Sequence, residues 1–95
     1  MFKMINTAGK LTKTARDMDT RAIRQNIRKF VTVTVNGMHF ARLDSDDGSH
    51  KWSAVLNGRL LDDPNFAMTE QDFAEVLEVS SKGGARIEFS NHSAL

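Results

Sequence analysis

The sequence predicts an α+β domain, with an antiparallel sheet of four to five strands and two helices in the order α-β-β-β-(β)-α-β. Three observations predict it. Apolar residues recur every three to four positions over residues 10–30, the period changes to two over residues 30–35, and a second helical stripe follows Thr69. Because 95 residues have room for one core, we expect a single domain over residues 10–95, preceded by a flexible N-terminus over residues 1–9.

The first helix is expected to be basic and amphipathic. Its apolar residues merge into one wide face that a strand period does not fit: Leu11, Ala15, Met18, Ala22, Ile23, Ile27 and Phe30. Thr14 and Asp19 are both suitable helix N-caps. A shorter helix that begins near Thr20, with residues 10–18 as a loose arm, is therefore an alternative to the long one.

The segments after this helix predict strands joined by tight turns. β-Branched and hydroxyl residues alternate directly before Asn36-Gly37, which is the strongest short signal for a hairpin. A polar turn over residues 44–49 and a second Asn-Gly pair at residues 57–58 separate the next strands. The expected strands are residues 30–35, 38–43, 50–56, 59–61 and 85–89.

The second helix has a sequence signature at both of its ends. Thr69 is a favourable N-cap, and acidic residues follow it in the first turn, where the helix dipole favours them. Phe73, Val76 and Leu77 make one apolar stripe. Gly83-Gly84 supplies the left-handed residue that ends many helices.

The turn lengths predict which side chains share a face of the sheet. A two-residue turn at Asn36-Gly37 pairs Val33 with Phe40. A six-residue second turn pairs Ala41 with Trp52, and a slip of one residue there would bury Trp52. The face expected to meet the helices holds Val31, Val33, Val35, Met38, Phe40 and Val55. The other, mixed face holds Thr32, Thr34, His39, Ala41, Leu43, His50, Trp52 and Ala54.

Charge is distributed unevenly along the chain. The net charge of the whole chain is +1, but residues 1–30 carry eight bases and two acids, a net +6, and residues 31–95 carry five bases and ten acids, a net −5. On a helix over residues 10–28, five bases fall within about 80° of arc, opposite the apolar face. These bases are Lys10, Lys13, Arg21, Arg24 and Arg28. Such a stripe suits a phosphate backbone, because each base that meets a phosphate releases counterions.

We therefore expect a non-catalytic protein that binds nucleic acid, single strands above all, with little preference for sequence. The basic stripe would hold phosphates, and Trp52 would stack bases. Hydrogen-bonding side chains on the same sheet face, Thr32, Thr34 and His39, would complete the binding surface. The small core also predicts a homo-oligomer. The choice between DNA and RNA stays open.

An alternative from a different class is a small inhibitor or adaptor that binds another protein through an acidic surface. Its acids would mimic or compete for an anionic ligand. They are Asp44, Asp46, Asp47, Asp62, Asp63, Glu70, Glu75 and Glu78. A third reading is a structural homo-oligomer in which the basic and acidic parts of different copies attract each other.

Composition argues against several other classes. Without cysteine the chain has no disulfide scaffold, cysteine-ligated zinc, iron–sulfur cluster or cysteine nucleophile. His39, His50 and His92 lack the spacing of metal ligands, and the Asp44–Gly48 turn lacks that of a calcium loop. Because glycine-rich phosphate loops and nucleophile motifs are also missing, we expect no enzymatic activity, no metal and no cofactor. With no apolar run long enough for a membrane and no secretory signal, we expect a cytoplasmic protein.

Overall fold

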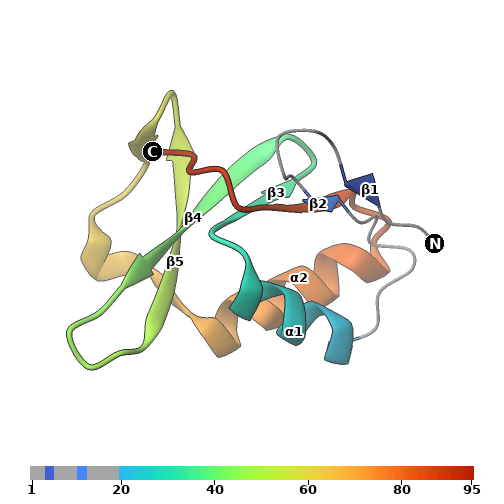
Figure 1. Cartoon of the computed structure of the whole chain (residues 1–95), viewed down its shortest axis with the longest axis horizontal. Coiled ribbons are helices and arrows are strands. Elements are labelled where there is room, and N and C mark those ends of the chain that lie inside the picture. The colour runs from blue at the N-terminus through green and yellow to red at the C-terminus, as the bar shows by residue number, and fades with distance from the viewer. Residues whose placement is uncertain (1–3, 6–10, 13–19) are drawn as a thin grey trace.

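The computed structural model describes residues 4–5, 11–12 and 20–95, and it has the predicted α+β architecture (Figure 1). The main antiparallel sheet has the strand order β6-β5-β4-β3-β8, and β7 also pairs with β5. Both helices lie against one face of this sheet. The helices are α1 (Thr20–Lys29), α2 (Glu70–Lys82) and the short 3-10 helix η2 (Pro64–Phe66). The strands are β1 (Met4–Ile5), β2 (Leu11–Thr12), β3 (Thr32–Val35), β4 (Met38–Asp44), β5 (His50–Leu56), β6 (Arg59–Leu60), β7 (Met68–Thr69) and β8 (Ile87–Ser90).

The hairpin of β3 and β4 has the predicted register. Val33 pairs with Phe40, and the two-residue turn places both Asn36 (φ 48°) and Gly37 (φ 86°) in the left-handed region. Asn and Gly adopt this conformation at low cost, and the twist of such a turn matches that of the strands. The hairpin is therefore encoded locally.

The register of the next hairpin differs from the prediction by one residue. Arg42, not Ala41, pairs with Trp52, because Asp44 still belongs to β4 and the turn contains five residues instead of six. A bond from the Ser45 N–H to the Ser49 carbonyl (2.9 Å) closes this turn, and Gly48 adopts φ 84° within it. Since successive side chains of a strand point to opposite faces, the slip turns Trp52 into the core. The same slip places Val55 opposite His39, on the other face from the one predicted.

The first helix is the shorter of the two alternatives. It begins at Thr20, and Leu11–Thr12 forms an extended strand that pairs with Met4–Ile5, so a continuous helix from Lys10 is wrong. Flexibility is expected of residues 1–9, of which all but Met4 and Ile5 lie outside the described residues. The apolar period of residues 10–18 was compatible with a helix, but the backbone pairing of β2 excludes helical geometry at residues 11–12.

The core is formed between the helices and one face of the sheet. Ile23 and Ile27 of α1 and Leu77 of α2 are fully or almost fully buried. Phe73 stacks on Trp52 at a centroid distance of 4.8 Å, and its ring lies 5.1 Å from that of Phe40. Aromatic pairs at such distances stabilise a core beyond the apolar area that they bury. The sheet also contributes Val33, Ile87 and Phe89 to this core.

The second helix has the ends that the sequence predicts. The Thr69 hydroxyl accepts a hydrogen bond from the Asp72 N–H (3.1 Å), and the helix ends before Gly83. The predicted apolar stripe is only partly correct. Phe73 and Leu77 are buried, whereas Val76 is 40% exposed.

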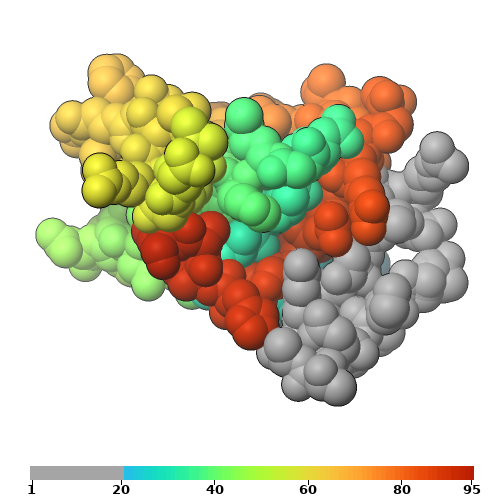
Figure 2. All heavy atoms as spheres, turned by 90° about the horizontal axis from the view of Figure 1, so that it is seen from above, coloured from blue at the N-terminus to red at the C-terminus, as the bar shows by residue number. Residues whose placement is uncertain are grey.

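The far face of the sheet is partly covered. The C-terminal residues 91–95 run across it from the end of β8, and Figure 2, which views the molecule from the side opposite the helices, shows them beside the β5–β6 hairpin. The Thr32 hydroxyl donates to the His92 carbonyl (2.6 Å) beneath this segment. Thr32 is therefore buried rather than available on an open surface. Over the described residues, no helix has the length and apolar character needed to cross a bilayer.

Candidate nucleic-acid interface

Three arginines lie along one side of α1, and we call them the basic face of α1. At 100° per residue, Arg21, Arg24 and Arg28 fall within about 60° of arc. Arg21 and Arg28 are exposed and Arg24 is half-buried, while Ile23 and Ile27 hold the other side of the helix in the core. The helix contains no acidic residue over its described length.

One of the three arginines already has a carboxylate partner. The Arg28 Nε atom lies 3.0 Å from Glu70 Oε1, which joins the last turn of α1 to the first residue of α2. The Arg28 side chain is 69% exposed, so this pair contributes little to stability and can exchange for another anion. Among the residues that the structure describes, Arg21 and Arg24 have no carboxylate within ion-pair distance.

The basic face of α1 contains three of the five bases of the predicted stripe. Lys10 and Lys13, which flank the strand at Leu11–Thr12 in the sequence, lie outside the described residues. From Arg21 to Arg28 the helix rises about 10 Å. This length corresponds to about three phosphates of one strand at 3.4 Å each.

The predicted stacking platform is absent, because Trp52 has no exposed surface. Its indole is stacked on Phe73 with an interplanar angle of 20°, and its Nε1 atom has no hydrogen-bond partner. No base can reach this ring in the folded protein. The cause is the one-residue register shift between β4 and β5, which moves Trp52 from the mixed face to the core face.

Two residues of the predicted platform remain on the far face of the sheet. Thr34 Oγ1 and His39 Nδ1 are hydrogen-bonded at 2.8 Å, and His39 is exposed. This pair projects from the face opposite the one on which α1 packs, since Thr34 alternates with the core residue Val33. The structure therefore does not bring Thr34 and His39 together with the basic face of α1.

One exposed aromatic residue was missed by the sequence analysis. Phe66, at the end of η2, is 79% exposed, and it lies in a loop outside every periodic segment. Only its isolation from any apolar stripe could have indicated its exposure. Asp62 and Asp63 precede it, and Asp63 accepts a bond from the Asn65 N–H (2.8 Å). Because these carboxylates repel phosphates, Phe66 does not replace Trp52 as a platform for a nucleic acid.

The acids of the alternative protein-binding hypothesis belong to three separate segments of the chain. They lie at the end of β4 and in the turn that follows it, in the loop after β6, and on α2. At the end of β4, Asp44 accepts a hydrogen bond from His50 Nδ1 of β5 (2.8 Å). Within the β4–β5 turn, the hydrogen bond from the Ser49 hydroxyl lowers the pKa of the Asp47 carboxyl. Within the described residues, no three histidine, aspartate or glutamate side chains are grouped as a metal site requires.

Comparison of the chain with family models, with curated proteins and with solved structures finds no match. The functional argument therefore depends on the surfaces of the chain itself. Among the bases singled out from the sequence, the structure groups Arg21, Arg24 and Arg28 on one side of α1.

Proposed function

We propose that this chain is a non-catalytic nucleic-acid-binding protein that holds phosphates with the basic face of α1. The observation that carries the proposal is that Arg21 and Arg24 have no carboxylate partner among the described residues. Ile23 and Ile27 anchor the same helix in the core, so the guanidinium groups are presented on a rigid element. Lys29 adds an exposed positive charge at the end of the helix.

The proposed contact is electrostatic and made to the backbone. Guanidinium groups donate in a fork that matches phosphate oxygens, and neighbouring like charges on one helix face are relieved by an anion. Three phosphate contacts give a slope of log K against log salt of about −2.7, so affinity falls about 40-fold between 50 and 200 mM salt.

The burial of Trp52 removes the predicted preference for single-stranded nucleic acid from the proposal. Without a stacking platform there is no physical basis for a preference for single strands, and the arginines read no base edges. We therefore expect single-stranded and duplex nucleic acids to bind with similar affinity and with little dependence on sequence.

The test is fluorescence anisotropy of a short labelled oligonucleotide, titrated with the chain at about 50 and 200 mM salt. Arg21→Gln combined with Arg24→Gln should reduce the salt slope to about −0.9, because one phosphate contact remains. The matched control combines Lys51→Gln in β5 with Arg59→Gln in β6, which removes the same charge from the sheet instead of from α1 and should leave the slope unchanged. Absence of binding at the lower salt, or an equal loss in the control, would overturn the proposal.

A second pair of variants tests whether affinity for the oligonucleotide rises when the basic face of α1 loses its carboxylate partner. Glu70→Gln removes the carboxylate that holds Arg28 and should strengthen binding about threefold. Glu88→Gln is the matched control, since it removes one carboxylate and releases Arg86 (3.5 Å apart) at the sheet edge instead. If both variants strengthen binding equally, net charge rather than the basic face of α1 determines affinity.

A further inference from the structure

The outward side of α2 is apolar along its middle. Val76 is 40% exposed and Val79 is 71% exposed, whereas Phe73 and Leu77 on the inward side are fully buried. An amphipathic helix at a protein surface normally presents polar residues on its outer side. Two neighbouring exposed valines on one helix therefore call for an explanation, whereas a single one would not.

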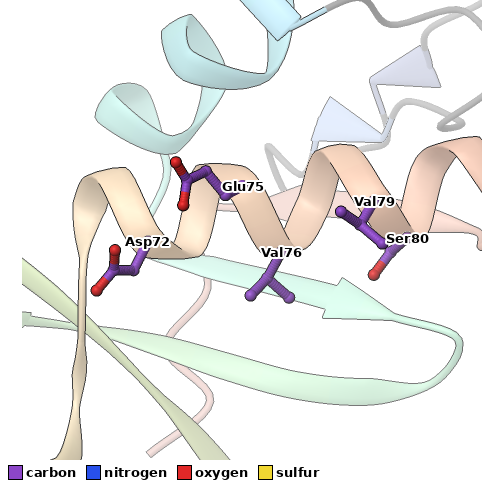
Figure 3. Close-up of a pocket in the computed structure, with 5 residues that line it drawn as sticks. All are labelled: Asp72, Glu75, Val76, Val79 and Ser80. Atoms are coloured by element: carbon purple, nitrogen blue, oxygen red, sulfur yellow. The ribbon is translucent and has the colours of Figure 1, made fainter.

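These valines belong to an open hollow, which we call the α2 groove. It has a volume of about 430 Å³ and is lined by Asp72, Glu75, Val76, Val79 and Ser80 (Figure 3). The residues are spaced by three and four positions, so they follow one side of the helix over two turns. In Figure 3, Val76 points away from α2 on the side of the β3–β4 hairpin, and Glu75 points to the side of α1.

Another exposed apolar side chain lies on the face of the sheet that α2 covers. Met38, directly after the Asn36-Gly37 turn, is 51% exposed. It shares a face of β4 with Phe40, whose ring contacts Phe73 of α2 at 5.1 Å. Met38 thus lies on the α2 side of the hairpin. The turn of the hairpin and the C-terminal end of α2 point toward the same end of the molecule (Figures 1 and 3).

Both charged side chains that line the groove, among the described residues, are acidic. Asp72 and Glu75 are exposed and have no ion pair among the residues that the structure describes, unlike Glu70 and Glu78, which pair with Arg28 and Lys82. An apolar strip bordered by two unpaired carboxylates complements a ligand that carries apolar and cationic groups together. It repels a nucleic acid, so its charge suits a different class of ligand from the one that the basic face of α1 suits.

We propose that the α2 groove binds a basic amphipathic helix of a partner protein. Val76 and Val79 are separated by about 4.5 Å along the axis, which is the spacing of apolar residues on successive turns of another helix. Apolar side chains of the partner rest on the two valines, and its lysine or arginine residues meet Asp72 and Glu75. The inference does not depend on nucleic-acid binding by α1.

A second copy of this chain is a poorer occupant. Its described basic helix, α1, exposes only polar and charged side chains, namely Arg21, Gln25, Arg28 and Lys29. The apolar residues of α1 are in the core. Such a helix would meet the carboxylates of the groove and leave the valines uncovered.

The test uses a fluorescein-labelled amphipathic peptide of leucine and lysine, about 15 residues long so that it can form a helix. Anisotropy is measured with the full chain at about 50 mM salt. Two comparison peptides separate the contributions: serine replaces leucine in one, and glutamate replaces lysine in the other. The leucine–lysine peptide should bind at least about tenfold more tightly than either.

Variants of the chain locate the binding. Val79→Ser and Glu75→Gln should each weaken the leucine–lysine peptide about fivefold or more. The matched controls are Leu56→Ser and Asp46→Asn. Leu56 is 59% exposed in β5, and Asp46 lies in the β4–β5 turn, so neither residue lines the groove. Both control variants should change the affinity for the peptide less than about twofold. All four positions are exposed, and circular dichroism verifies that each variant is folded.

Four results would overturn the proposal. In the binding assay, these are no binding of the leucine–lysine peptide, equally tight binding of the serine–lysine peptide, and an equal loss of peptide affinity in the control variants. In sedimentation, the fourth is a dimer of the chain that Val79→Ser converts to a monomer. The last result would assign the groove to a second copy of the chain. A salt-sensitive oligonucleotide complex that Val79→Ser leaves intact would support the separation of the two surfaces.

Discussion

Phe73 is the residue through which α2 holds both the β3–β4 hairpin and Trp52. Its side chain is fully buried, with the Trp52 ring stacked at 4.8 Å and the Phe40 ring at 5.1 Å. Replacing Phe73 with leucine keeps most of the apolar volume but removes both aromatic pairs. Each pair contributes about 0.5–1.5 kcal/mol beyond burial, so we expect Phe73→Leu to lower the free energy of unfolding by about 1–3 kcal/mol. That is a large part of the stability of a domain of this size, about 5–15 kcal/mol.

Urea unfolding followed by tryptophan fluorescence and by far-UV circular dichroism measures this loss. Trp52 is the only tryptophan, so its emission reports the packing that the substitution changes. Thermal unfolding should show a fall of about 4–8 °C in Tm for each kcal/mol. Phe66→Leu makes the same chemical change at a side chain 79% exposed and should cost less than about 0.5 kcal/mol. If Phe73→Leu costs no more than Phe66→Leu, the assignment of the aromatic cluster to the core is refuted.

Three further predictions concern a cap, a turn and the buried indole. Thr69→Ala removes the acceptor for the Asp72 N–H and should lower the free energy of unfolding by about 1 kcal/mol in the same urea assay; an unchanged midpoint would contradict the cap. Ser49→Ala should raise the pKa of Asp47 toward its ordinary 3.8, as followed by NMR titration of the carboxyl. Because the pKa of Asp47 is lowered by folding, its stabilising contribution is present above the ordinary value and is lost as pH falls through the folded value. Trp52 emission should be blue-shifted, resist iodide quenching and stay constant when an oligonucleotide is added, and strong quenching by iodide would contradict its burial.

Several elements could be predicted because short stretches of sequence determine them. The hairpin of β3 and β4 depends on an Asn-Gly turn and on alternation in the adjoining strands. The start of α2 depends on the Thr69 cap. The alignment of Arg21, Arg24 and Arg28 on one side of α1 follows from the helical period alone. In each case the interacting groups are a few positions apart in the chain.

Contacts between residues distant in the sequence decided the features that could not be predicted. A turn of five or six polar residues can join β4 to β5, and the shorter one is selected where Trp52 can stack on Phe73 of α2. Likewise, the pairing of Arg28 with Glu70 spans 42 positions. The exposure of Val76, within a stripe that the periodicity assigns to the core, depends on where α2 meets the sheet. The sequence by itself therefore determined which elements form and which residues share a side of each helix. Only tertiary packing, through the burial of the aromatic cluster, decided which of those sides and sheet faces remain open to a partner.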